Sequence, residues 1–121
     1  MSNENRKHVR FPFRALSITH LTGSSYIDQI STIAGNISER GVGLRSYIPL
    51  RKGSKVTVDL SFINKKGDEV NDRITGKVAW TQRKGDIFFA GVSFHDRLCD
   101  DKHPQLFAHF NDFVKFDPMM V

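Results

Sequence analysis

The sequence predicts an all-β fold with a C-terminal helix, in which six strands form an antiparallel β-barrel. Three observations predict this fold. Apolar and polar residues alternate with a period of two over several short runs, as they do in half-buried strands. Turn residues separate these runs at short intervals, and the apolar period becomes that of a helix near the C-terminus. Short strands joined by tight turns are typical of a closed or nearly closed barrel.

The first half of the chain predicts three strands. The first begins near Phe13, where two sets of residues alternate along the chain: Ala15, Ser17 and Thr19 with Leu16, Ile18 and His20. Residues 22–25 have the composition of a turn, and a second strand is expected over residues 26–34. We then expect a loop at residues 36–41 and a third extended segment over residues 41–45.

The second half predicts three more strands. The clearest covers residues 55–62 and places four apolar side chains on one face: Val56, Val58, Leu60 and Phe62. Residues 64–68 close a hairpin, and residues 73–82 return with three expected inward positions: Ile74, Val78 and Trp80. A turn at residues 84–86 leads into the last strand, over residues 87–95.

A helix is expected after residue 100. Asp100 and Asp101 favour the positive end of a helix dipole, and Pro104 is tolerated in a first helical turn. Apolar residues then recur at helical spacing: Leu106, Phe107, Phe110, Phe113 and Val114. We expect this stripe to cover a barrel opening or lie against the barrel wall. A partner interface, such as a homodimer contact, is the alternative.

Composition indicates one compact domain of 121 residues, 39% of them hydrophobic. We divide it into a flexible arm (1–12), the barrel (13–97) and the helix with its tail (98–121). The formal net charge of +5 favours polyanionic ligands. The single cysteine, Cys99, excludes an internal disulfide. The N-terminus has no apolar signal segment and no stretch is long enough to cross a bilayer, so we expect a cytoplasmic protein without membrane insertion.

No pattern in the sequence indicates catalysis. The five histidines lack metal-ligand spacing, and we expect no metal and no cofactor. His95 and Asp96 are interpreted as a strand end, not as an acid–base pair. Cys99 lies among carboxylates, which disfavour a reactive thiolate. An enzyme is therefore the least favoured class.

Two short motifs point instead to an anionic, guanine-containing ligand. The first is RxxxR at residues 6–10, and the second is NxSxxG at residues 36–41. Guanidinium groups stack on bases and donate paired hydrogen bonds to phosphate or to a guanine edge. An amide can bond a base edge, a hydroxyl can bond phosphate, and glycine allows a close backbone approach.

Together these motifs resemble those of the PilZ family of bacterial cyclic di-GMP receptors. The similarity extends from about Arg6 to Phe94 and includes the segments GKVAW at residues 76–80 and FAGVSF at residues 89–94. It implies a six-stranded barrel and a ligand site made of five residues: Arg6, Arg10, Asn36, Ser38 and Gly41. Three neighbours are candidates for additional contacts: Lys7, His8 and Arg40.

The resemblance implies a receptor whose arm orders over the barrel when cyclic di-GMP binds. The receptor would then signal to a protein partner in motility, exopolysaccharide or biofilm control. Two alternatives stay open. One is a PilZ-like module that binds only protein. The other is a small basic barrel that binds single-stranded nucleic acid, which is disfavoured because most phenylalanines fall on expected inward faces or on the helix.

Overall fold

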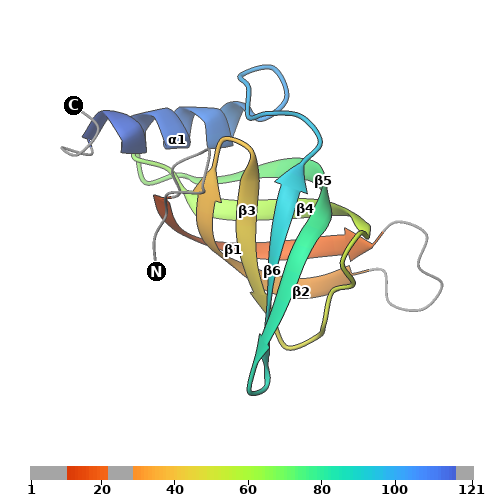
Figure 1. Ribbon diagram of the computed structural model, residues 1–121. Helices are drawn as coiled ribbons and strands as arrows, with labels where there is room; N and C mark the ends of the chain where they lie inside the picture. The colour runs from red at the N-terminus through yellow and green to blue at the C-terminus, as the bar shows by residue number, and fades with distance from the viewer. Residues whose placement is uncertain (1–10, 22–28, 117–121) are drawn as a thin grey trace.

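The computed structural model describes residues 11–21 and 29–116. Within them the chain forms a closed antiparallel barrel of six strands and one helix (Figure 1). The strands neighbour one another in the order β1-β2-β3-β6-β5-β4, which confirms the predicted fold class. The elements are β1 (Phe11–Leu21), β2 (Gln29–Ser38), β3 (Gly41–Ser46), β4 (Lys55–Ile63), β5 (Glu69–Lys84), β6 (Ile87–Phe94) and α1 (Pro104–Phe116).

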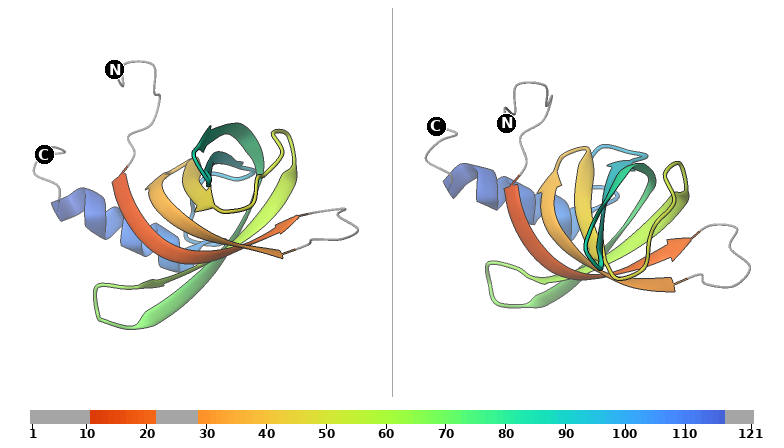
Figure 2. Two further views of the ribbon diagram at one scale, coloured as in Figure 1. Left: turned by 90° about the horizontal axis from the view of Figure 1, so that it is seen from below. Right: turned by 60° about the horizontal axis from the view of Figure 1, so that its bottom comes forward.

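The helix and the β5–β6 hairpin lie at opposite ends of the barrel. Figure 1 shows α1 across one end, while the tip of the β5–β6 hairpin projects beyond the other. Figure 2 views the barrel from the hairpin side, with α1 behind the strands. The helix therefore lies at one end of the barrel, where it contacts β5.

Strict alternation in β4 builds much of the core. The four apolar side chains expected on one face are buried: Val56, Val58, Leu60 and Phe62. They pack with inward residues of the other strands, among them Leu44, Ile74 and Val92. The prediction for this strand is confirmed, because a period of two matches a strand whose two faces meet core and solvent.

The inward position expected for Trp80 is wrong. Val78 pairs with Val92, but the next pair is Trp80 with Gly91, so that Ala79 is an extra residue in β5. Such a β-bulge changes which face the following residues occupy. Val78 is buried, whereas Trp80 is 41% exposed on the outer face.

In β1 the smaller and more polar set of residues faces inward. Ser17 and Thr19 are buried, and both hydroxyls hydrogen-bond to Thr32 of β2. This pairing satisfies polar groups that would otherwise be costly to bury. Leu16 and Ile18 consequently lie outside, where 72% and 44% of their surfaces are exposed.

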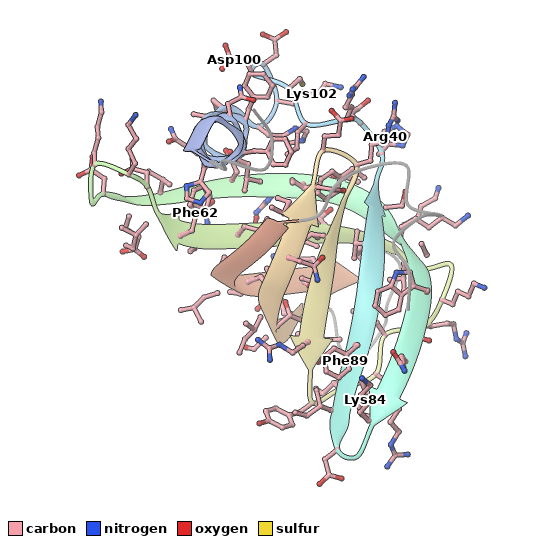
Figure 3. The ribbon with its side chains drawn as sticks, turned by 60° about the vertical axis from the view of Figure 1, so that its left-hand side comes forward. Arg40, Phe62, Lys84, Phe89, Asp100 and Lys102 are labelled. Atoms are coloured by element: carbon pink, nitrogen blue, oxygen red, sulfur yellow. The ribbon has the colours of Figure 1, made fainter. Side chains whose placement is uncertain are left out.

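The apolar stripe of α1 packs against the barrel as far as the structure describes its side chains. Leu106 is buried in the core, and Phe107 and Phe110 pack against it. The Leu106 backbone N–H donates to Asp72 Oδ2 of β5 at 2.7 Å, which caps the first helical turn. The Phe62 ring lies beneath the helix (Figure 3).

Candidate functional site

The NxSxxG motif lies on a tight β2–β3 hairpin and not in the loop expected for residues 36–41. Asn36 and Ser38 belong to β2, and Gly41 begins β3. Asn36 pairs with Gly43 and Ser38 with Gly41, so that only Glu39 and Arg40 form the turn. Because the ladder continues to this turn, the motif residues are held by backbone hydrogen bonds.

A bulge in β2 brings Asn36 to the outer face. The register shifts between Ala34 and Asn36, which leaves Gly35 as the extra residue. Ala34 and Ile37 are both buried, whereas Asn36 is half-buried. The bulge therefore turns the Asn36 amide away from the core.

The Asn36 amide lies directly over Gly43 of the neighbouring strand. A Cβ atom at Gly43 would be 2.7 Å from Asn36 Nδ2 and 2.9 Å from Oδ1. Only glycine leaves space for the amide at this position. Asn36 is thus held flat against the outer surface of β3.

Trp80 covers the next glycine in the same row. Gly43 pairs with Gly91 of β6, and Gly91 pairs with Trp80 of β5. A Cβ at Gly91 would be 2.0 Å from Trp80 Nε1 and 2.4 Å from Cε2, so the indole lies on the glycine backbone. The amide of Asn36 and the indole of Trp80 therefore approach one another from opposite sides of the Gly43–Gly91 pair.

The hairpin turn is fixed to the rest of the barrel. Ser38 is buried, and its Oγ accepts a hydrogen bond from the Arg40 backbone N–H at 3.3 Å. Arg97 donates to both carboxylate oxygens of Glu39, and Phe94 N–H donates to the Arg40 carbonyl at 2.8 Å. The Arg40 side chain is exposed above this turn (Figure 3).

Arg45 places a cation beside the amide. Residues Gly41, Gly43 and Arg45 alternate outward along β3. The Arg45 Nε lies 3.9 Å from where a Cβ would stand on Gly35, the bulge glycine next to Asn36. The guanidinium is half-buried and forms no hydrogen bond or salt bridge with any residue that the structure describes.

Sequence reasoning missed Trp80 and Arg45 as parts of this site. The regular alternation from Gly41 could have indicated Arg45, since every second residue of a strand shares a face. Trp80 could not be found in this way, because the bulge at Ala79 breaks the alternation. Arg6, Lys7, His8 and Arg10 lie outside the described residues.

The arrangement suits a planar, anionic ligand. The indole can stack on a base, the amide can bond a base edge, and the guanidinium can bond phosphate. Because Gly43 and Gly91 have no side chains, no side chain of this pair projects between the Asn36 amide and the Trp80 indole. Each of these groups lies on a strand of the closed barrel, which fixes their relative positions.

A groove of about 970 Å³ lies on the adjoining outer face. Its walls include Leu16, Ile18, Ile33 and Arg45, but none of the three motif residues on β2 and β3. Arg45 therefore lies between an apolar groove and the polar site around Asn36.

An ion-pair network occupies the outer face of β4. Arg73 Nε donates to Asp59 Oδ1 at 2.6 Å, and His20 Nε2 lies 2.8 Å from Asp59 Oδ2. The hydrogen bond from Arg73 is the main reason why the pKa of the Asp59 carboxyl is below its usual value. Among the described residues, no group of three potential ligands could hold a metal ion. In the same part of the chain, no helix is long and apolar enough to span a membrane.

A closed barrel with a polar and aromatic site on its outer face defines a class of small binding modules. The model of the PilZ domain matches residues 4–109, so the chain belongs to the PilZ family. PilZ domains form a family of cyclic di-GMP receptors and are binding modules rather than enzymes. The family predicted from the two motifs is confirmed.

A solved structure shows the same fold. It is that of the inhibitor of motility MotI/DgrA of Bacillus subtilis, with a TM-score of 0.68 and 11% sequence identity. The match covers 93% of this chain and 53% of that protein, so the chain spans about half of its length. No curated protein matches the chain.

Proposed function

We propose that this protein is a cyclic di-GMP receptor that acts without enzymatic activity. The observation that carries the proposal is the approach of Asn36 and Trp80 over the Gly43–Gly91 pair. A guanine base held there would stack on the indole and bond the amide through its edge. Membership of a cyclic di-GMP receptor family supports the same ligand.

The position of β1 supports a role for the RxxxR motif. β1 begins at Phe11, directly after Arg10 in the sequence, and Phe11 pairs with Ile37. The chain thus joins the barrel beside Asn36 and Ser38. We propose that Arg6 and Arg10 clasp the ligand against this face, where they would bond guanine O6 and N7 and the phosphates.

Other residues complete the proposed site. Ser38 would offer its hydroxyl and Gly41 a close backbone approach, while Arg45 would bond a phosphate oxygen. Lys7, His8 and Arg40 would add contacts around the arm.

We propose that ligand binding creates a new surface for a partner protein. In the cytoplasm, the arm would order over the bound dinucleotide, and a partner protein would recognise arm, ligand and barrel together. Control of motility, exopolysaccharide or biofilm formation is the proposed process. The likeness to a motility inhibitor supports the first of these.

Isothermal titration calorimetry tests the ligand. Cyclic di-GMP is titrated into the wild type and into Arg6→Ala/Arg10→Ala at one fixed salt concentration, with GTP as the control ligand. Arg51→Ala/Arg83→Ala is the matched control, because both of its side chains are exposed and it removes the same charge. We expect micromolar or tighter binding that is lost only in the RxxxR variant. Loss of each bidentate contact should lower affinity by roughly tenfold to a hundredfold. Absence of heat with the wild type, together with unchanged amide NMR shifts, would contradict the proposal.

A second candidate function is binding of single-stranded nucleic acid. The β5–β6 hairpin favours it, because cations lie over aromatic rings there: Lys84 Nζ is 5.7 Å from the Phe89 centroid (Figure 3), and Arg83 Cζ is 5.5 Å from that of Phe88. Interleaved cations and rings are used for such binding. An oligothymidylate that binds more tightly than cyclic di-GMP would favour this candidate.

A further inference from the structure

Three lysines border a cleft on the outer face of the barrel, next to the candidate site. Lys55 of β4 pairs with Lys77 of β5, and Lys52 lies in the turn between β3 and β4. The cleft has a volume of about 880 Å³ and is also lined by Thr75, Ser93 and His95. We call Lys52, Lys55 and Lys77 the lysine stripe.

The charge of the lysine stripe is not neutralised within the part of the chain that the structure describes. All three lysines are exposed, and none has a salt bridge or a side-chain hydrogen bond to a described residue. Like charges directly opposite one another in a sheet repel. Along the outer face of β4, the first carboxylate after Lys55 is that of Asp59. The two positions are four residues apart, which corresponds to about 13 Å at the rise per residue of a strand. Asp59 already binds Arg73 and His20.

The stripe is also held in place by backbone hydrogen bonds. Gly53 N–H donates to the Val78 carbonyl at 2.8 Å, and Val78 N–H donates to the Ser54 carbonyl at 2.9 Å. Gly53 has a φ of 90°, which favours glycine. The turn that carries Lys52 is therefore fixed beside β5 and close to Lys77.

The stripe continues the row of residues that forms the proposed ligand site. Lys77 pairs with Ser93, Ser93 with Gly41, and Gly41 with Ser38. A molecule bound along the stripe would therefore lie next to a nucleotide bound at the hairpin.

We propose that the lysine stripe is a docking surface for an acidic segment of a partner protein. The inference rests on the proposed function, because the lysine stripe would be the surface through which the partner binds the receptor–cyclic di-GMP complex. Three uncompensated cations complement carboxylates, and such a surface speeds association and selects partners by charge. A protein segment fits better than single-stranded nucleic acid, because successive bases need several rings for stacking and the cleft offers one exposed ring, that of His95: Phe94, its one phenyl side chain, is buried in the core.

Fluorescence anisotropy with a labelled oligoglutamate peptide tests the surface without the nucleotide. The variant is Lys52→Glu/Lys55→Glu, in which the new carboxylate at residue 55 would face Lys77. The control is Lys65→Glu/Lys66→Glu in the β4–β5 turn, which changes the net charge equally and whose side chains are also exposed. We expect the stripe variant to bind the peptide about tenfold more weakly, because two exposed charge pairs become repulsive. The control should bind like the wild type.

Two further measurements separate this proposal from others. Calorimetry with cyclic di-GMP on both variants should give wild-type affinity, and a selective loss in the stripe variant would instead assign the lysines to the nucleotide and overturn the proposal. Equal loss of peptide binding in both variants would also overturn it, since net charge alone would then explain the binding. So would a labelled oligothymidylate that binds the stripe more tightly than the peptide does. Failure of the wild type to bind cyclic di-GMP would refute the proposed function alone.

Discussion

Asn36 and Trp80 reach toward one another over a pair of register partners, although 43 residues separate them in the sequence. The amide of Asn36 lies on Gly43 and the indole of Trp80 lies on Gly91. Gly43 and Gly91 are opposite one another in the β3–β6 ladder. A polar group and an aromatic ring are thus brought together by two positions that carry no side chain.

The substitution Gly43→Ala should weaken cyclic di-GMP binding with little effect on folding. The new Cβ would stand 2.7 Å from Asn36 Nδ2, so the amide must move off the strand. Because the amide is the end of a flexible side chain on the surface, the fold can accommodate the change. Loss of its base contacts, at about 1 kcal/mol, corresponds to a roughly fivefold to tenfold lower affinity by calorimetry.

Gly35→Ala is the matched control for that change. A Cβ added at Gly35 would be 3.9 Å from the nearest side-chain atom, Arg45 Nε, which is an ordinary van der Waals contact. This variant should keep wild-type affinity. Equal weakening in both variants would mean that any added methyl group on this surface disturbs binding, and that the Asn36 contact is not the cause.

Trp80 should report binding through its own fluorescence. It is the single tryptophan of the chain, and it is 41% exposed on the outer face. A guanine stacked on the indole should change the emission, with a midpoint equal to the dissociation constant from calorimetry. GTP should give no saturating change. Unchanged emission during a titration that saturates by calorimetry would place the ligand elsewhere.

The strands could be predicted from the sequence where alternation is regular. In β4 each of the four expected apolar residues is buried, because a period of two maps directly onto the two faces of a strand. Trp80 was placed wrongly because an extra residue at Ala79 changes the face without changing the composition. A bulge is determined by pairing with another strand, and a single strand's sequence does not contain that information.

The candidate site could be predicted only in part for the same reason. Asn36, Ser38 and Gly41 follow from a local motif. The contributions of Gly91 and Trp80 depend on the register between β3, β6 and β5, which joins residues far apart in the chain. The expected loop at the motif was also too long, because the β2–β3 ladder continues to Ser38 and Gly41.

Asp72 should stabilise the protein by joining the helix to the barrel. Its carboxylate is buried and accepts a hydrogen bond from the Leu106 N–H at 2.7 Å. Asp72→Ala leaves that N–H without its acceptor, so the free energy of unfolding should fall by about 1–2 kcal/mol in urea denaturation. Asp72→Asn keeps an oxygen acceptor and should cost less. Equal losses in the two variants would mean that the hydrogen bond is not the main contribution.

His103 should make stability depend on pH. The side chain is 5% exposed, and its Nδ1 has no hydrogen-bond partner among the described residues. Burial lowers the pKa of His103 below its usual value of 6.5, and the nearby Asp72 opposes this shift. Between the lowered pKa and about 6.5, the unfolded chain binds more protons than the folded protein. This contribution to stability is therefore complete above about pH 6.5 and is lost as the pH falls toward the lowered pKa.

Thermal denaturation across that pH range tests the role of His103. His103→Gln should show a smaller fall in midpoint with acidification than the wild type does. His95→Gln removes an exposed histidine instead and should keep the wild-type dependence. If His103→Gln retains the full dependence, another group must be responsible.

Asn36→Asp should strengthen cyclic di-GMP binding. A carboxylate has nearly the size of the amide, so it can occupy the same space over Gly43. A charged acceptor bonds guanine N1–H and N2–H more strongly than a neutral one. A gain of about 1 kcal/mol would raise affinity roughly fivefold to tenfold by calorimetry. Asn36→Ala should lower it, because both amide atoms are removed. If Asn36→Asp binds as weakly as Asn36→Ala, the amide must act as a donor, to a phosphate or a carbonyl oxygen, and the guanine edge must be bound by other residues.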